Sequence, residues 1–328
     1  MHFSPHHSPL LGVTTSTGSI ALYEWCTQPS LGRKEHLLHR HTLQLFDAAT
    51  VVTSLAWDLH MADRIHLSST TGEITTVTLS PGERLTGCED LTSGNTFQAA
   101  TGGPSYAIET LARHDLEAWT VVATPPSWTA QGLYSGADDA SIKFTPFGDA
   151  SDSTCDDTNP PWSNSRIHAA GVVSILPLTD GILLTGSYDD RLRIIATPSL
   201  PGMRPQVLHE LNLGGGVWRL KSLSPAATPP ALGRDPSTAA AAAAAAAPGD
   251  REFEARILIS GMYAGAFVVD VGRGAEDSWS SRVVARFAEH ESMNYACEVL
   301  GPPSLDVRAP RTFLSCSFYD KRLCLWGF

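Results

Sequence analysis

A unit of two short strands joined by a tight turn recurs along this chain of 328 residues and limits the folds that it can adopt. Each unit has an apolar strand that ends in small residues, a turn rich in Gly, Asp or Ser, and a strand with alternating apolar residues. Alternation buries one face of a strand, and small or acidic residues accept the backbone conformation of a tight hairpin. Six units are present: residues 11–25 (LGVTTSTGSIALYEW), 66–79 (HLSSTTGEITTVTL), 132–147 (GLYSGADDASIKFTPF), 181–197 (GILLTGSYDDRLRIIAT), 257–271 (ILISGMYAGAFVVDV) and 312–326 (TFLSCSFYDKRLCLW). The repetition predicts an all-β fold made of successive small sheets.

The spacing of the units indicates which repeat architecture they build. Successive units start at or above the roughly 40–45 residues of a WD40 repeat. A short apolar strand precedes most units, at residues 51–57, 119–123, 172–176, 217–220 and 295–299. Four strands per unit are typical of a propeller blade, and no amphipathic helical segment competes. We therefore predict a single WD40 β-propeller domain over residues 1–328, of the seven-bladed type.

The start of the chain does not fit a complete propeller of this type. The first unit opens at Leu10 and Leu11, where the second strand of a blade is expected, and nothing before it has the pattern of a first strand. We therefore expect five full blades and one partial blade, with the first blade missing. A propeller must close or it leaves strand edges exposed. A coding sequence that begins too late is the favoured explanation, and a ring of six irregular blades is the alternative.

Three stretches lie outside the repeat pattern. Residues 222–253 combine a Pro-rich segment with a run of alanines and are expected to form a disordered insertion. Residues 150–165 and 272–279 are expected to be surface loops.

Charge and cysteine usage exclude several classes of partner. The formal net charge is −11, which is a poor match for a nucleic-acid backbone. No apolar run is long enough to span a membrane, and the six cysteines form no CxxC pair. We expect a cytoplasmic monomer that binds neither nucleic acid nor membranes.

The His36, His39 and His41 cluster lacks a set of Cys or carboxylate ligands beside it, so no metal is expected.

Three histidines precede inner strands of the predicted blades. In WD repeats, a histidine at this position forms a hydrogen bond with a Ser or Thr of the second strand. This network continues to an Asp in the turn. His, Ser and Asp together also suggest nucleophilic catalysis, but a buried polar network that locks a blade is the favoured interpretation. The predicted network comprises His114, His168, Ser135, Ser187, Ser315, Asp139, Asp190 and Asp320, with His290 as the third histidine.

An ordered set of motifs carries a resemblance to a known family. They are HDLEAW (114–119), YSGADD (134–139), GVVSI (171–175), TGSYDD (185–190), GGVWR (215–219), SGMYAGA (260–266) and CSFYDKRLCLW (316–326). This set resembles the diphthine methyl ester hydrolase family, the WD-repeat enzymes of the diphthamide pathway. The resemblance covers roughly residues 54–328, and members of that family begin with an additional blade.

The resemblance implies an activity, a substrate and a compartment. The family removes the methyl ester of diphthine, a modified histidine on elongation factor 2, and releases methanol and the free carboxylate. The expected activity is therefore that of a carboxylic-ester hydrolase without a cofactor, in the eukaryotic cytosol. Elongation factor 2 is the expected protein substrate, and other enzymes of the diphthamide pathway are candidate partners.

The chemistry of this substrate singles out candidate site residues. Its trimethylammonium group binds to aromatic faces, at about 0.5–2 kcal/mol per ring, and the candidates are Trp119, Trp218, Tyr263 and Tyr295. Arg219 is the candidate for holding the oxyanion or the product carboxylate. Glu117 and one of the three histidines, His114, His168 or His290, are the candidate general bases, and His290 is the histidine selected. Packing in the core is the alternative role for each of these side chains.

Two other functions remain open from the residues alone. A WD40 propeller without catalytic activity would serve as an adaptor between proteins. A truncated propeller could also be an inactive relative of an enzyme. The chain has no GxSxG motif, which excludes the nucleophile elbow of an α/β-hydrolase.

Overall fold

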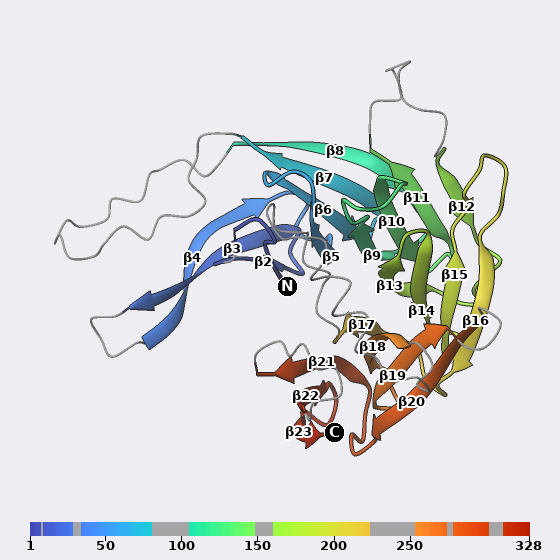
Figure 1. Cartoon of the computed structure of the whole chain (residues 1–328). Coiled ribbons are helices and arrows are strands. Elements are labelled where there is room, and N and C mark those ends of the chain that lie inside the picture. The colour runs from blue at the N-terminus through green and yellow to red at the C-terminus, as the bar shows by residue number, and fades with distance from the viewer. Residues whose placement is uncertain are drawn as a thin grey trace, which may run out of the picture. The chain divides into compact units, whose positions relative to one another are not determined.

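The computed structural model describes residues 1–7, 9–28, 34–80, 105–147, 160–223, 253–273, 278–301 and 311–328. Within these ranges the regular structure consists of β-strands alone, arranged in six antiparallel sheets (Figure 1). Five sheets have four strands and one has three. Chain contacts divide the molecule into two compact units. The first comprises residues 1–181 and 198–204, and the second comprises residues 182–197 and 205–328.

The first unit contains three complete sheets and the first strand of a fourth. The first sheet is β1 (His2–Phe3), β2 (Leu10–Thr14), β3 (Ser19–Gln28) and β4 (Lys34–Gln44). The second is β5 (Val52–Trp57), β6 (Arg64–Ser69), β7 (Glu73–Leu79) and β8 (Tyr106–Arg113). The third is β9 (Ala118–Ala123), β10 (Gly132–Ala137), β11 (Ile142–Pro146) and β12 (Trp162–Asn164).

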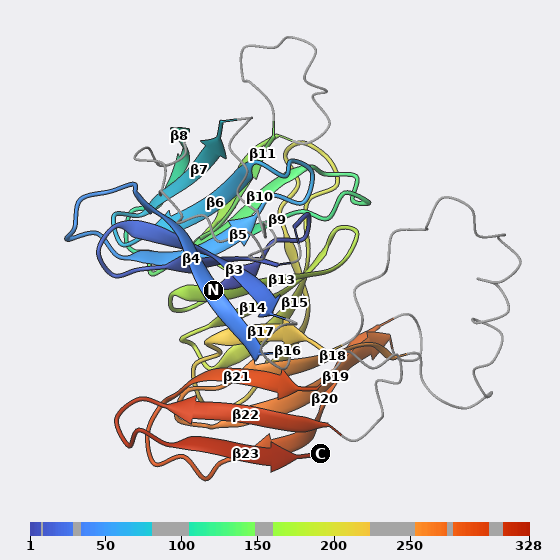
Figure 2. The same cartoon turned by 90° about the vertical axis from the view of Figure 1, so that its left-hand side faces the viewer.

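The remaining strands lie mostly in the second unit. The fourth sheet is β13 (Val172–Thr179), β14 (Ile182–Ser187), β15 (Arg191–Ala196) and β16 (Gln206–Asn212), of which β13 belongs to the first unit. The fifth is β17 (Arg219–Ser222), β18 (Phe253–Ser260), β19 (Ala266–Arg273) and β20 (Trp279–Phe287). The sixth is β21 (Asn294–Leu300), β22 (Thr312–Ser317) and β23 (Leu323–Gly327), which lie side by side in Figure 2.

Strand alternation places the apolar residues in cores between the sheets. In the first unit, Leu10, Ile20 and Leu22 pack with Leu55 and Leu67 of the next sheet, and all five are almost fully buried. A second core uses apolar residues of the third sheet: Val121, Ala123 and Leu133. In the second unit the corresponding cluster is Leu223, Leu258, Val268 and Phe313. The six hairpins predicted from the repeat coincide with β2–β3, β6–β7, β10–β11, β14–β15, β18–β19 and β22–β23.

The predicted number of blades was wrong. The structure has six sheets, not the five full blades and one partial blade of a seven-bladed propeller. The first sheet contains the inner strand that the sequence did not reveal, because β1 pairs with β2 through Phe3 and Leu11. The indole of Trp57 donates a hydrogen bond to the carbonyl of His2 at 2.9 Å. A strand of two residues is too short to show alternation, so tertiary contacts mark it where periodicity does not.

The predicted loops are only partly visible. Residues 224–252, most of the predicted insertion, lie outside the described residues, as do 148–159 and 274–277. Part of the predicted 150–165 loop is strand: β12 pairs with β11 through Trp162 and Phe144. The ends of the predicted 272–279 loop are also strand, in β19 and β20.

A buried polar network stabilises the second sheet. The carboxylate of Asp58 accepts hydrogen bonds from Nε2 of His66 at 3.1 Å and from the backbone N–H groups of His60 and Met61. The other ring nitrogen of His66 contacts Oγ1 of Thr76 at 2.8 Å. Burial alone would raise the pKa of Asp58, but these hydrogen bonds outweigh it and lower the pKa to about 2. Asp58 and His66 are each 1% exposed, so this Asp–His–Thr set is a structural network.

Candidate functional site

A continuous row of aromatic rings runs through the second unit. Tyr188 stacks on Trp218 with ring centroids 5.9 Å apart, and Trp218 meets Tyr295 edge to face at 5.5 Å. Tyr295 contacts Phe318 at 5.8 Å, and Phe318 contacts Tyr319 at 5.1 Å. These five residues form what we call the aromatic cluster. They come from the β14–β15 turn, the residue before β17, β21 and the β22–β23 turn.

Backbone hydrogen bonds fix the position of Trp218 in this row. The N–H of Val217 donates to the carbonyl of Ser187 at 2.9 Å, on the turn that carries Tyr188. The N–H of Trp218 donates to the carbonyl of Ser260 at 2.8 Å, on the neighbouring strand β18. The ring is therefore anchored through its own backbone to two hairpins at once.

Asn294 holds the other half of the cluster and is completely buried. Its backbone N–H donates to the carbonyl of Met262 at 3.0 Å, next to Tyr263. Its side-chain amide donates to the carbonyl of Cys316 at 3.1 Å, two residues before Phe318. Because Tyr295 follows Asn294 directly, one buried amide determines where the β18–β19 turn, Tyr295 and the β22–β23 turn lie.

The outer rings of the row face solvent. Tyr263, Phe318 and Tyr319 are 72%, 66% and 65% exposed, whereas Trp218 and Tyr295 are half-buried. Burial raises the pKa of the Tyr295 phenol, and the nearby phenols of Tyr319 and Tyr263 add to this rise. Tyr263 therefore lies close to the aromatic cluster. Exposed aromatic faces of this kind can bind an organic cation.

Arg219 lies against the inner part of the row. Its guanidinium carbon is 4.4 Å from the centroid of the Trp218 ring, and its Nη1 donates to the Trp218 carbonyl at 3.0 Å. Burial lowers the pKa of Arg219 to about 10, so the group remains a cation at neutral pH. Arg219 already occupies a face of Trp218. A bound cation would be repelled from that face, so Trp218 serves to position Arg219, and the outer rings are better placed to bind a cation.

Sequence reasoning identified part of this site and missed the rest. It selected Trp218, Arg219, Tyr263 and Tyr295, which the structure brings together in one unit. It missed Tyr188, Phe318 and Tyr319. The signal was present, since the TGSYDD and CSFYD motifs place aromatic residues in turns where small polar residues are usual.

His290 lies between β20 and β21 in the second unit, with the ring of Phe287 beside it. Its Nε2 is 2.8 Å from Oγ of Ser315, and burial lowers its pKa, against the opposing effect of Asp320. The imidazole is therefore neutral at pH 7 and can accept a proton. The carboxylate of Asp320 instead accepts from the Ser292 hydroxyl and from the N–H of Glu291 at 3.0 Å.

His114 in the first unit has a fuller set of partners. Its Nε2 is 2.9 Å from Oγ of Ser135, and its Nδ1 is 3.1 Å from the carboxylate of Asp139. His114 is 2% exposed. Burial lowers its pKa, although Asp139 raises it. The three side chains link the segment before β9 to the β10–β11 turn, as expected of a polar network that stabilises a blade.

The pKa of His114 gives a testable dependence of stability on pH. The unfolded histidine titrates near its usual value of about 6.5, whereas the folded one titrates lower. As the pH falls below about 6.5, the unfolded state binds a proton that the folded state does not, so the free energy of unfolding should decrease. His114→Gln should make this decrease shallower by up to about 1.4 kcal/mol per pH unit. Urea unfolding between pH 7 and 5 measures it, with the exposed His7→Gln as control, and equal slopes for all three proteins would contradict it.

The other predicted polar residues are distributed over both units. His168 is buried in the first unit, and Ser187 in the second. The turn carboxylate of the fourth sheet is that of Asp189, which accepts from the N–H of Arg191 at 3.2 Å and pairs with Arg193 at 2.7 Å. Asp190, the predicted network member, instead takes the left-handed turn position with a φ of 67°.

Glu117 and Trp119 belong to the first unit, together with a carboxylate that sequence reasoning missed. The carbonyl of Glu117 accepts a hydrogen bond from the N–H of Asp138 at 2.9 Å. Burial raises the pKa of Asp138, the indole N–H of Trp119 lowers it, and the charge of Glu117 raises it again. A carboxyl group with a raised pKa, as in Asp138, takes up a proton more readily than an exposed one.

Among the described residues, no three His, Cys, Asp or Glu side chains are placed to hold a metal ion. His36, His39 and His41 lie along β4, opposite Cys26, Tyr23 and Leu22. The described residues include no helix that is long and apolar enough to cross a membrane.

Comparison with curated proteins finds relatives along the whole chain. A Schizosaccharomyces pombe protein named diphthine methyltransferase is 26% identical over 330 residues, which cover 99% of this chain and 76% of the relative. A Saccharomyces cerevisiae protein of the same name is 26% identical over 363 residues, which cover 99% of this chain and 82% of the relative. A Dictyostelium discoideum diphthine methyltransferase homolog is 30% identical over 112 residues, or 33% of this chain and 29% of that protein. No family model matches the chain.

Comparison with solved structures concerns the fold. A chain of the mitotic checkpoint complex matches with a TM-score of 0.55 at 14% identity and covers 98% of this chain and 74% of that one. Sqt1 from Chaetomium thermophilum matches with a TM-score of 0.55 at 14% identity, over 94% of this chain and 64% of that one. The WD40 β-propeller domain of Doa1 has a TM-score of 0.45 at 14% identity, over 84% and 64%. Successive antiparallel sheets, each with its strands in sequence order, give the described part of the chain an all-β, WD40-like β-propeller fold.

Proposed function

We propose that this protein hydrolyses the methyl ester of diphthine on elongation factor 2, giving diphthine and methanol. Similarity over 99% of the chain to two proteins named diphthine methyltransferase points to the diphthamide pathway. The ester-hydrolase activity, elongation factor 2 as protein substrate and a cytoplasmic location form the finer part of the proposal. The observation that supports it most directly is the aromatic cluster with Arg219 beside it.

The substrate combines a fixed cation with an ester, and the site offers a group for each. The trimethylammonium group would lie against the exposed rings of Phe318, Tyr319 and Tyr263. The ester carbonyl would then point inward, toward the guanidinium of Arg219. Because Arg219 is held by the ring and the carbonyl of Trp218, it is oriented before the substrate arrives.

The reaction that these groups support is addition of water to the ester carbonyl. Water loses a proton to a general base and forms a bond to the carbonyl carbon, and the oxyanion that develops is stabilised by Arg219. The bond to the methoxy oxygen then breaks, the proton goes to the departing methanol, and a carboxylate remains. The neutral imidazole of His290 is the candidate base within the second unit.

The names of the relatives suggest methyl transfer as the second candidate function. Hydrolysis removes the mass of one CH2 group from the modified peptide, whereas methyl transfer adds it. The amine of the methyl ester is already quaternary and its carboxyl is already esterified, so it can lose a methyl group but not accept one. The two candidates are therefore separated by two peptides: hydrolysis is measured on the methyl ester, and methyl transfer on diphthine with a free carboxylate.

The test uses the full chain and purified elongation factor 2 that carries the diphthine methyl ester. We expect loss of one CH2 mass from the modified peptide without any added methyl donor. In 18O-labelled water, one labelled oxygen should appear in the new carboxylate. On elongation factor 2 that carries diphthine with a free carboxylate, a gain of one CH2 mass that requires S-adenosylmethionine would assign the protein as a transferase. An unchanged peptide under both conditions would leave the non-catalytic adaptor as the function.

A further inference from the structure

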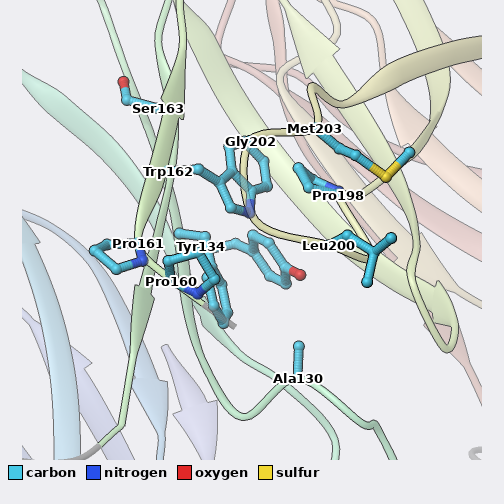
Figure 3. A pocket seen from close by; sticks show the side chains of 11 residues that line it. Ala130, Tyr134, Pro160, Pro161, Trp162, Ser163, Pro198, Leu200, Gly202 and Met203 are labelled. Carbon is cyan, nitrogen blue, oxygen red and sulfur yellow. The ribbon is translucent and has the colours of Figure 1, made fainter. Parts of the chain in front are cut away.

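A second site lies in the first unit, on the sheet formed by β9 to β12. A pocket of about 310 Å³ opens between the strands β10, β11 and β12 and the segment of residues 198–203 (Figure 3). Its size is at the lower end of the range for ligand sites, which is about 300–1,000 Å³. Such a pocket admits one or two small side-chain groups of a larger partner.

Aromatic rings form the floor and one wall of this pocket. The ring centroids of Tyr134 and Phe144 are 4.9 Å apart, and both residues are almost fully buried, so the floor is rigid. The ring of Trp162 is 6.0 Å from Tyr134 and lies nearly parallel to Phe144 at 6.4 Å. Figure 3 shows the side chain of Trp162 reaching from β12 toward the 198–203 segment. The half-buried ring of Trp162 offers flat apolar surface to a ligand, and Tyr134 and Phe144 support it from beneath.

The lining carries no charged side chain. Its other members include Pro160, Pro161, Pro198, Leu200 and Met203. The indole of Trp162 adds a polar N–H group to this lining, whereas the Ser163 side chain points away from the pocket (Figure 3). A matching ligand is therefore uncharged and apolar.

We propose that this pocket binds a proline-rich segment of a partner protein. Prolyl rings are uncharged and pack on aromatic faces, and proline residues present backbone carbonyls but no N–H donors. A polyproline II helix is already extended and loses little entropy on binding, which is why aromatic-lined grooves recognise it. Prolyl rings would lie between Trp162 and Leu200, over Tyr134. Leu200 and Met203, which are 64% and 45% exposed, extend the apolar surface at the rim.

The test titrates the full chain with a blocked, fluorophore-labelled peptide of ten prolines, followed by fluorescence anisotropy. A labelled peptide of the same length made of alternating Gly and Ser is the control ligand. We expect saturable binding of the proline peptide with a Kd below about 1 mM, a range typical of weak peptide recognition. The control peptide should bind at least about tenfold more weakly, a factor of ten being 1.4 kcal/mol.

Two variants locate the binding in the pocket. Leu200→Asp introduces a charge at the exposed rim, where it should not disturb the core, and should weaken binding at least about tenfold. Leu116→Asp is the matched control, because Leu116 is 51% exposed, lies in the same unit and does not line the pocket. Trp162→Ala should also weaken binding, with far-UV circular dichroism as the check on folding.

Three outcomes would overturn the proposal. They are absence of saturable binding at millimolar proline peptide, equal affinity for both peptides, and equal loss of affinity in Leu200→Asp and Leu116→Asp. Ester hydrolysis is expected to be unchanged in Leu200→Asp, so failure of this proposal and failure of the proposed function are distinguishable.

Discussion

Replacement of Arg219 by Ala is expected to lower kcat/KM for the diphthine methyl ester by about 100- to 1,000-fold, the range for losing one oriented group that stabilises an oxyanion. The guanidinium carbon lies 4.4 Å from the Trp218 ring centroid, so the charge is held in one orientation. Its partly buried position strengthens its interaction with a developing negative charge. Most of the loss should appear in kcat, because the oxyanion exists in the transition state and not in the bound ester.

Two further variants make this prediction specific to Arg219. Arg219→Lys keeps the charge but loses the planar group that stacks on Trp218, so it should recover only part of the activity. Arg282→Ala is the control, since Arg282 is in the same unit and its side chain is 78% exposed. Steady-state kinetics with the modified factor give kcat and KM separately, and urea unfolding reports stability. A folded Arg219→Ala protein with wild-type kcat would rule out a role for Arg219 in the reaction.

Loss of the exposed rings is expected to weaken binding of the substrate cation. Phe318→Ala and Tyr319→Ala should each raise KM by about 2- to 30-fold, which corresponds to about 0.5–2 kcal/mol per ring. The physical reason is that each ring face offers negative electrostatic potential to the trimethylammonium group. Because this group is charged in the bound ester and in the transition state alike, kcat should change little.

A neutral substrate separates cation binding from simple apolar contact. In an analogue of the modified peptide, a tert-butyl group replaces trimethylammonium with nearly the same shape but no charge. The wild-type protein should bind this analogue more weakly, and Phe318→Ala should then have little further effect. Phe3→Ala is the control, because Phe3 is 51% exposed in the first unit. If Phe318→Ala weakened binding of both substrates by the same factor, the rings would act by apolar contact only.

The hairpins and most of the strands that precede them were predictable, whereas the outer strands β4, β8, β16 and β20 were not predicted. Two short strands that the prediction also missed share a physical cause. Each predicted hairpin has enough residues to show alternation, as in Ile142 to Phe144 of β11 or Leu323 to Trp326 of β23. The strands β1 and β12 have two and three residues, too few for a period of two to be visible. Both lie at the edge of a four-stranded sheet and are positioned by pairing with β2 and β11. The error in the number of blades follows from missing β1.

The candidate site was predictable as a set of residue types but not as an arrangement. Sequence motifs selected Trp218, Arg219 and Tyr295, which the structure places together. They did not indicate that the Arg219 guanidinium covers a face of Trp218. They therefore assigned cation binding to a ring whose face is already covered by a cationic side chain. They also missed Phe318 and Tyr319, because only the unusual residue type in the turn marks these two residues, and no periodicity does.

The sequence by itself determined the local structure of this protein: apolar alternation and turn residues specify which segments pair as hairpins, since both act between residues close along the chain. The tertiary structure alone decided how many sheets the chain forms and which aromatic rings meet. Tyr188 and Trp218 are neighbours because Val217 bonds to the backbone of Ser187. Tyr295 and Phe318 are neighbours because the buried amide of Asn294 bonds to Cys316. These contacts join segments about 20–30 residues or more apart, and only packing of whole hairpins brings such segments together.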